Sequence, residues 1–368
     1  ARVVNSRAQE VIRRSHPDFP ERVAGLYTED DMSPIFDAIP APGDGDHLEA
    51  ARWATREAAR AGFTTVHCLV GGAAEIWALA RLRAEGALGC RIRVQLPYHL
   101  LDRLDELSVP RDDDWLSLGN VKLFADGSLG ARTAALSQPY HDDPSTAGEL
   151  LMTAEEIAAG VVRVWRAGLQ PCVHAIGDLA VDTVAAAYEQ ALAQCPEAAG
   201  VKGRPRVEHA SLVSPDTVTK LARLRIACCV QPQFVRSDWW TEERLGPERV
   251  RSAYPFRDLA DAGVPLLGGT DCPVEKLEAL TALACAVARP GEEWARRFGQ
   301  ELRLGEALRM FAKTSAEVLG EARDEGTLSP GSRADFLVLG DDPRAAADLE
   351  QLPVEQVWVG GEERPGEG

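Results

Sequence analysis

Four ionisable residues in this chain are of types that could together hold a metal ion and activate water: Lys122, His174, His209 and Asp271. Each lies at or just beyond the downstream end of a short apolar run that is typical of a β-strand, and helix-like sequence separates the four runs. In parallel α/β barrels the strand ends converge, because the loops that follow the strands meet at one mouth. Two neutral imidazoles, a carboxylate and a lysine at such a mouth would make a metal site with room for water.

The elements that would position these residues follow a simple alternation. From about Asp44 onward, short β-rich runs alternate with helical patterns, and seven β units can be counted. Repeated βα units favour a parallel sheet, which forms either a barrel or an open doubly wound sheet. No G-x-G-x-x-G motif opens a helix after a strand, so the dinucleotide-binding open sheet lacks its phosphate cradle.

The distribution of the chemical residues favours the barrel. They recur on four separate strands, whereas an open sheet gathers its ligand at one switch point. We therefore predict an α/β fold, a TIM-type (β/α) barrel, in which the first of the eight β units of a closed barrel is missing from this chain. We expect residues 1–325 to form this catalytic domain, incomplete at its N-terminus, residues 326–360 to form strands of a small β domain, and residues 361–368 to be a disordered tail.

The composition narrows the possible partners and compartment. A formal net charge of -17 argues against a nucleic acid duplex or an anionic membrane as partner. Eight cysteines without a C-x-x-C pair indicate reduced thiols, and no apolar run reaches the length of a membrane span. We therefore expect a cytoplasmic protein that acts on a small molecule, and we leave open whether it forms a homo-oligomer.

Five short motifs follow one another along the chain. They are VKLFADGS at 121–128, VHAIGD at 173–178, VEHA at 207–210, GTDCPV at 269–274 and GSRAD at 331–335. Together they resemble the amidohydrolase superfamily of metal-dependent hydrolases, and within it the branch of N-substituted formamide deformylase-like amidohydrolases. Each motif alone is weak evidence, but five in this order are strong evidence.

The resemblance implies a role for each of the four residues that could bind metal. It makes Lys122 the fourth-strand lysine, carboxylated to bridge metals, and it makes His174 and His209 the fifth-strand and sixth-strand ligands. Asp271 becomes the eighth-strand aspartate that binds metal and shuttles protons. The implied cofactor is a divalent metal, expected to be zinc, as one or two ions. Independent chemistry agrees, because a carboxylated lysine is an anionic oxygen donor and imidazoles suit zinc.

One departure from the family pattern is important. The family has an H-x-H pair at the end of the first barrel strand, and none of the seven histidines of this chain forms one. The opening Val3–Ala8 resembles a segment that the family places well after that strand. We therefore expect this chain to lack the family's N-terminal region, including half of the outer β domain, the first strand and two metal ligands.

Five further residues are candidates for binding substrate: His67, Asp126, Gln231, Gln233 and Trp239. Gln231, Gln233 and Trp239 follow the seventh strand, where loops shape substrate pockets, although loop packing explains them equally well. His67 is expected to line the mouth, with metal ligation as the less favoured alternative, and Asp126 is also suited to capping or bracing the loop that follows Lys122. Each metal candidate has a structural alternative as well. His174 and His209 could be satisfied core histidines, Lys122 could form an ion pair with Asp126 or another acid, and Asp271 could cap the helix that follows it.

These observations lead to a hypothesis for the chemistry. The chain would hydrolyse a C–N bond, most simply in an N-acyl or N-formyl amide, by metal-activated water, with Asp271 taking the water proton and returning it to the departing amine. No G-x-S-x-G motif suggests a protein nucleophile. Two alternatives stay open: a deaminase or cyclic amidohydrolase that uses the same site, and a catalytically impaired barrel with a binding or regulatory role.

Overall fold

The computed structural model describes residues 2–22, 25–27 and 32–364. The chain divides into two compact units, Ala1–Glu49 and Ala50–Gly368. The first unit pairs β1 (Arg2–Val3) with β2 (Leu26–Tyr27) in antiparallel fashion and carries the helices α1 (Ser6–Ser15) and α2 (Ser33–Asp37). Its small apolar core consists of Val4, Ile12, Phe19 and Tyr27.

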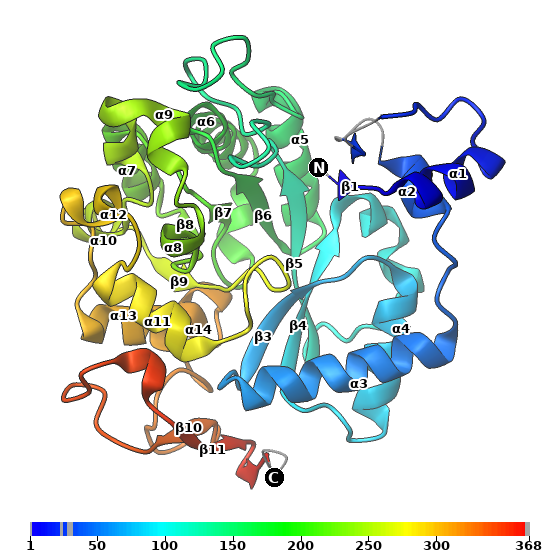
Figure 1. Ribbon diagram of the computed structural model, residues 1–368. Coiled ribbons are helices and arrows are strands. Elements are labelled where there is room, and N and C mark those ends of the chain that lie inside the picture. Colours follow the sequence, from blue (N-terminus) through cyan, green and yellow to red (C-terminus); the bar gives the residue numbers. More distant parts are fainter. Residues whose placement is uncertain (1, 23–24, 28–31, 365–368) are drawn as a thin grey trace. The chain divides into compact units, whose positions relative to one another are not determined.

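The second unit is built on a curled, seven-stranded parallel sheet whose strands lie side by side in chain order (Figure 1). The strands are β3 (Thr65–Leu69), β4 (Arg91–Pro97), β5 (Leu116–Phe124), β6 (Gln170–Ala175), β7 (Arg206–His209), β8 (Ala227–Val230) and β9 (Leu266–Gly268). The TIM-type fold and its seven β units are confirmed. Within the part of the chain that is described, no strand pairs with the outer edge of β3 or of β9.

Helices precede, connect and follow these strands, as the alternation predicts. They are α3 (Asp44–Arg60), α4 (Ala73–Ala84), α5 (Ala154–Arg166), α6 (Asp178–Gln194), α7 (Pro215–Leu224), α10 (Phe256–Asp261) and α11 (Ala279–Ala288). The start of α5 shows why the sequence folds in this way. Thr153 Oγ1 accepts from the Glu156 N–H at 3.2 Å, and the Glu156 carboxylate accepts from the Thr153 N–H at 2.8 Å, so two N–H groups of the helix start are satisfied reciprocally.

The sequence after residue 303 has the pattern of one continuous helix, but the structure has two helices there. The chain forms α13 (Leu304–Phe311) and α14 (Lys313–Leu319), separated by the non-helical Ala312. Ser315 donates its hydroxyl to the Met310 carbonyl oxygen at 2.8 Å, which competes with the backbone hydrogen bonds of a continuous helix. Three short helices that the pattern does not predict are α8 (Phe234–Ser237), α9 (Thr241–Arg249) and α12 (Glu293–Arg297).

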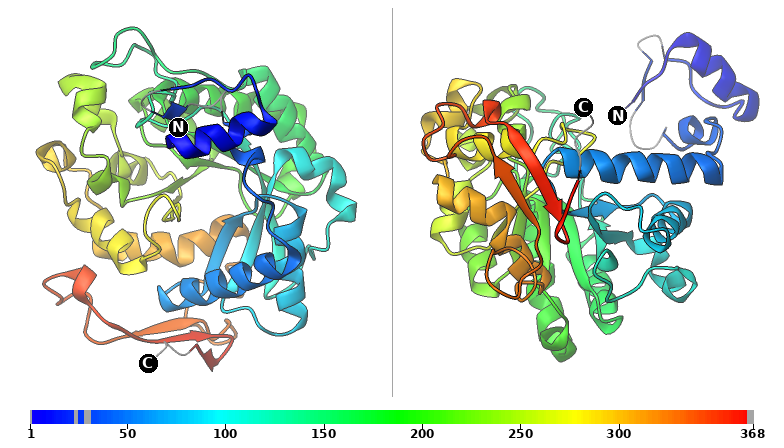
Figure 2. Two further views of the ribbon diagram at one scale, coloured as in Figure 1. Left: turned by 45° about the vertical axis from the view of Figure 1, so that its right-hand side comes forward. Right: turned by 90° about the horizontal axis from the view of Figure 1, so that it is seen from below.

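The C-terminal strands form a small antiparallel sheet outside the seven-stranded one (Figure 2). Its strands are β10 (Phe336–Leu339), β11 (Val354–Val359) and β12 (Glu362–Glu363). The last strand lies inside the range expected to be a disordered tail, whereas residues 365–368 of that range lie outside the described residues. The expected domain boundaries at 325 and 360 stay a prediction. None of the described helices combines the length and the apolar character needed to cross a bilayer.

Candidate active site

The sheet brings three of the four candidate metal ligands to the carboxyl ends of neighbouring strands. Lys122 lies near the end of β5, His174 on β6 and His209 at the end of β7. The β6–β7 register pairs Ala175 with His209, so the two imidazoles meet edge to face with their ring centroids 4.4 Å apart. The Lys122 charge reaches both histidines and Asp271, since it lowers the pKa of all three groups. The four side chains therefore share one electrostatic environment.

His174 is held from the loop that follows β5. Its Nε2 lies 2.9 Å from the Gly127 carbonyl oxygen and 3.4 Å from Asp126 Oδ1. Burial, followed by the charge of Lys122, lowers the pKa of His174 to about 4. The imidazole is therefore neutral near pH 7, which is the form that binds metal.

His209 is buried and strained. Its φ of 75° lies in the left-handed region, as does the φ of 46° of Ala210 and that of 59° of Asp271. Non-glycine residues rarely adopt this conformation, and where they do they cluster at functional sites. Burial, followed by His174 and Lys122, holds the pKa of His209 well below its usual value. Its Nδ1 is buried without a hydrogen-bond partner among the described residues.

Asp271 follows β9 at the exposed rim of the site. Desolvation by neighbouring atoms raises the pKa of its carboxyl group, and the Lys122 charge opposes this rise. The side chain remains accessible to water, as a group that exchanges protons with a bound substrate must be.

Asp126 braces the site, and its contact with a substrate stays a prediction. Its side chain is buried, and its two oxygens accept hydrogen bonds from the backbone N–H groups of Ala135, Ile176 and Gly177 at 2.9, 3.0 and 2.9 Å. Burial raises the pKa of Asp126 to about 7, and these three N–H groups oppose the rise. The carboxylate therefore ties the loop after β5 to the end of β6, which fixes the Gly127 carbonyl beside His174.

The other substrate candidates lie in different places. Gln231 is buried beside His209, where its side chain opposes the drop in the pKa of that histidine. Gln233 is also buried, and its Nε2 donates to the Lys276 carbonyl oxygen at 3.0 Å. Trp239 is 61% exposed on the segment between α8 and α9. His67 lies within β3, where its Nδ1 accepts from Arg206 at 3.2 Å. Their substrate contacts stay predictions.

The sequence reading missed a charged pair directly beneath the site. Arg206 Nε lies 2.5 Å from Glu208 Oε1, and Gln95 Nε2 donates to the same oxygen at 3.4 Å. The Glu208 charge raises the pKa of His174 and of Asp271, against the effect of Lys122. The signal was present in the Arg206-Val207-Glu208 alternation, which places both charged side chains on one face of β7.

The donor set fits a divalent metal in its chemistry. His174 and His209 supply neutral nitrogen donors, and the unpartnered Nδ1 of His209 is a buried lone pair or N–H that a further partner must satisfy. Asp271 adds a carboxylate, and Lys122 would add an oxygen donor once carboxylated. Across the described ranges, however, no three His, Cys, Asp or Glu side chains converge into a ready-made metal cluster. The side chains in their present form thus supply only part of a coordination shell.

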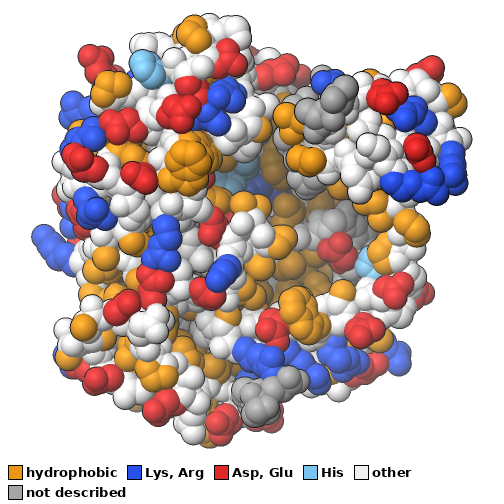
Figure 3. Space-filling view, in the orientation of Figure 1, with side chains coloured by type: hydrophobic (Ala, Val, Ile, Leu, Met, Phe, Trp, Pro, Cys, Tyr) orange, Lys and Arg blue, Asp and Glu red, His pale blue; other side chains and the backbone are white. Residues whose placement is uncertain are grey.

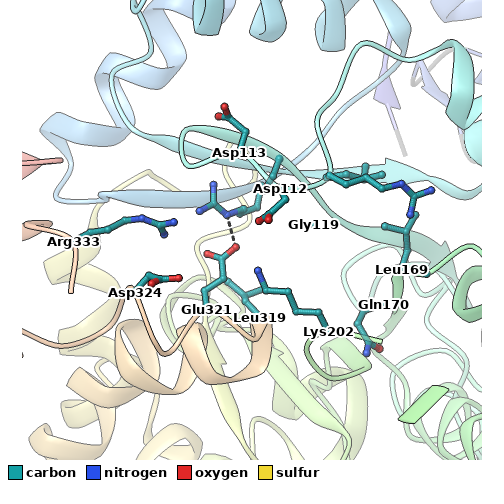
Figure 4. Close-up of a pocket in the computed structure, with 15 residues that line it drawn as sticks. Asp112, Asp113, Gly119, Leu169, Gln170, Lys202, Leu319, Glu321, Asp324 and Arg333 are labelled. Carbon is teal, nitrogen blue, oxygen red and sulfur yellow. Dashed lines mark hydrogen bonds and ion pairs between the residues drawn. The ribbon is translucent and has the colours of Figure 1, made fainter. Parts of the chain in front are cut away.

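The surface above the strand ends is hollowed, and histidine and hydrophobic side chains are visible inside the hollow (Figure 3). A separate pocket of about 110 Å³ lies near the amino ends of the strands (Figure 4). None of the candidate residues lines this second pocket, whose lining includes Arg93, Ser117, Gly119, Lys202, Glu321 and Arg333.

Comparison with known proteins gives concordant results. The model of the Amidohydrolase family matches residues 1–364. The putative amidohydrolase YtcJ of Bacillus subtilis is 32% identical over 296 residues, which are 77% of this chain and 54% of that protein. N-substituted formamide deformylase of Arthrobacter pascens is 27% identical over 265 residues, which are 71% of this chain and 48% of that protein. The chain thus spans about half the length of these curated relatives.

A solved structure extends the likeness to the fold. An uncharacterized metal-dependent hydrolase from Pyrococcus furiosus is 33% identical to this chain and superposes with a TM-score of 0.78. The match covers 90% of this chain and 68% of that structure.

Proposed function

Because the chain belongs to the amidohydrolase family, we propose that it is a metal-dependent hydrolase that cleaves the C–N bond of an N-acyl or N-formyl amide. The observation that carries this proposal is the pair of neutral imidazoles of His174 and His209. Their ring centroids lie 4.4 Å apart at the carboxyl ends of neighbouring strands, and the charge of Lys122 acts on both. Its likeness to a formamide deformylase supports the choice of bond.

We assign each site residue a role in this reaction. His174 and His209 would hold the metal together with Asp271 and carboxylated Lys122, and a zinc ion bound there would lower the pKa of water and polarise the amide carbonyl. Asp271, which lies at the exposed rim, accepts the water proton and returns it to the departing amine. The Gly127 carbonyl and Asp126 keep the His174 ring in place.

Product analysis combined with metal analysis tests the proposal. The purified chain, loaded with zinc, is incubated with a panel of N-formyl and N-acyl amides and cyclic amides, and amine, carboxylate and ammonia release are measured. We expect amine and carboxylate in equal amounts, and a decrease in kcat of about 10²–10⁴-fold in Asp271→Asn. The matched control is Asp216→Asn on α7, which should keep full activity. Ammonia release from a ring substrate would instead assign a deaminase.

A second candidate function is a barrel that binds a ligand without catalysis. It is favoured by one observation, that no three His, Cys, Asp or Glu side chains of the described residues form a metal cluster. Metal content separates the two functions. Less than about a tenth of an equivalent of zinc, iron or manganese after loading, together with no hydrolysis of any amide, would favour the binding protein over the hydrolase.

The remaining expectations are also proposals. We propose a small-molecule substrate, a cytoplasmic location and neither nucleic acid nor membrane as partner, in keeping with the net charge of -17. The outer edges of β3 and β9 have no partner strand within the described residues, and such edges favour pairing with another chain. Sedimentation of the purified protein tests whether a homo-oligomer forms.

A further inference from the structure

The lumen of the curled sheet, beneath the candidate site, is lined by polar side chains. Inward-facing side chains of alternate strands form stacked layers in such barrels, and branched apolar residues usually fill them. Here Arg206 of β7 lies 3.2 Å from His67 of β3, although β3 and β7 are not neighbours in the sheet, so this contact crosses the lumen. The strand register also brings Asn120 of β5 to this layer. Asn120 pairs with Gln95, and Gln95 pairs with Leu69, which lies two residues beyond His67 on β3. Because the strands of a barrel are tilted, a layer shifts along the register in this way from one strand to the next.

The contact with Arg206 fixes the tautomer of His67. A guanidinium group only donates hydrogen bonds, so His67 Nδ1 accepts from it and the ring hydrogen resides on Nε2. Burial, followed by the Arg206 charge, holds the pKa of His67 well below its usual value, so the ring is neutral. His67 Nε2 is therefore a hydrogen-bond donor. It is buried, and it has no acceptor among the described residues.

Asn120 presents the complementary group. Its side chain is on the same face of β5 as Lys122, is 3% exposed, and carries a buried Oδ1 that has no donor in the described part of the chain. The amides of its register neighbours are already engaged. Gln95 Nε2 donates to Glu208, and Gln170 Nε2 donates to the carbonyl oxygens of residues 201 and 203.

One layer of the lumen thus holds a buried donor and a buried acceptor, each without a partner in the protein. Buried polar groups are almost always paired, either with protein or with ordered water. We propose that this layer binds a water molecule that accepts a hydrogen bond from His67 Nε2 and donates one to Asn120 Oδ1. Two to four polar partners are typical of such internal waters. A metal ion does not suit this position, because the protonated Nε2 has no lone pair to offer.

The second pocket lies near this layer, at the amino ends of the strands (Figure 4). It is lined by Arg93, which pairs in register with His67, and by Gly119, which precedes Asn120. The pocket therefore adjoins the strand segments next to the polar layer. The proposed water links Asn120 through His67 and Arg206 to Glu208, the carboxylate that lies beneath the candidate site.

A high-resolution crystal structure of the unmodified chain tests the proposal directly. We expect a single density peak within about 3.5 Å of both His67 Nε2 and Asn120 Oδ1. A layer without density would overturn the proposal, and so would direct contact between the two side chains. Crystals soaked in bromide provide a second arm, because an anomalous peak at this position would identify an anion site in place of water.

A double-mutant cycle tests the sharing of the water. His67→Phe and Asn120→Leu each remove one of the two polar groups and leave the other without a partner, so we expect each to lower Tm by about 2 °C or more. The double variant removes both groups and should be at least as stable as the less stable single variant. Single variants that raise Tm, or losses that simply add, would contradict a shared water. His99→Phe, at an exposed histidine, is the matched control and should leave Tm unchanged.

Discussion

Arg91 and Asp335 form a buried, two-pronged ion pair that joins the first residue of β4 to the residue before β10. Arg91 Nε lies 2.6 Å from Asp335 Oδ2, and Arg91 Nη2 lies 3.0 Å from Asp335 Oδ1. The side chains are 3% and 7% exposed, and Asp335 Oδ1 also accepts from the Gly360 N–H at 2.6 Å. This carboxylate therefore attaches the C-terminal sheet to barrel strand β4, and it holds the start of β10 and the end of β11 together.

Removing the charge of Asp335 should destabilise the second unit strongly. Asp335→Asn leaves the buried Arg91 guanidinium with only the more distant Glu325 carboxylate, 3.8 Å from its Nε, and we expect the free energy of unfolding to fall by about 3 kcal/mol in denaturant titrations. The control is Asp342→Asn, whose carboxylate pairs with Arg344 two residues away at the surface, and which should leave the free energy of unfolding unchanged within error. Equal losses in the two variants would refute the structural role given to Asp335.

Asp142 joins the loop after β5 to α9. Its Oδ2 accepts from Arg132 Nη2 at 2.7 Å and also from Arg244 Nη1, and Arg249 donates to the carbonyl oxygens of Gln138 and Pro139 at 2.9 and 2.7 Å. The loop that holds the Gly127 carbonyl against His174 is thus tied to the segment that follows β8.

Asp142→Asn should loosen this connection without unfolding the chain. Both arginines keep a neutral acceptor but lose a charge-assisted partner, so we expect the local opening free energy to fall by about 2–3 kcal/mol. Hydrogen exchange should become faster at the His141 N–H, which donates to the Arg244 carbonyl oxygen at 2.8 Å. Asp143→Asn, at a partly exposed neighbour whose carboxylate accepts hydrogen bonds from Ser145, is the control and should leave this exchange unchanged.

The sequence predicts the repeating part of the fold because local signals there agree with the tertiary structure. In the helix Pro215–Leu224, for example, the preceding Ser214 is a residue that favours a helix start, and its Oγ accepts from the Thr217 N–H at 3.2 Å as a helix cap. α8 and α9 were not predicted, since α8 has only four residues and α9 contains Gly246 and Pro247, which disfavour helix in isolation. Packing against the rest of the unit decides their conformation.

In the candidate site, too, some features can be predicted from the sequence and others depend on tertiary contacts. His174 and His209 were found from their strand-end motifs, because strand ends are readable along the chain. A bracing role for Asp126 was foreseen as an alternative, but its partners and the role of Glu208 were not, since they depend on contacts with Ala135 and Gln95 that arise from loop geometry and strand register. A single sequence carries the alternation within a strand but not the pairing between distant strands.

Asp238 gives the second unit a stability that depends on pH. Its carboxylate accepts a short hydrogen bond from the Tyr254 hydroxyl, yet burial raises the pKa of Asp238 to about 6. The usual pKa of an aspartate is about 3.9. The folded chain therefore holds this proton more tightly than the unfolded chain, and the contribution of Asp238 to stability falls as the pH rises from about 4 to 6.

Asp238→Asn should remove this dependence, because asparagine keeps an acceptor for Tyr254 but does not ionise. We expect the free energy of unfolding of the variant, relative to the unmodified chain, to rise by up to about 3 kcal/mol between pH 4 and pH 7. Denaturant titrations at several pH values measure this difference. A difference that stays constant, or that falls with pH, would show that Asp238 does not carry the dependence.

If the site binds metal as proposed, Lys122 would determine how many metal ions it holds. Its ammonium nitrogen lies 5.2 Å from the centre of the Phe124 ring, and its charge acts on His174, His209 and Asp271. Carboxylation would turn this cation into an anionic oxygen donor able to bridge two metals. We therefore expect Lys122→Ala to abolish the binding of a second zinc equivalent when the chain is loaded in the presence of bicarbonate.

Elemental analysis of the loaded protein gives the metal content, and a carbamate signal from isotope-labelled bicarbonate reports the modification of the lysine. The signal should be present in the unmodified chain and absent in Lys122→Ala. Lys220→Ala serves as the control, since Lys220 pairs with Asp182 at 2.7 Å on the surface and should change neither readout. If Lys122→Ala retains the zinc stoichiometry of the unmodified chain, Lys122 is not a ligand, and the two histidines and Asp271 must account for the metal without it.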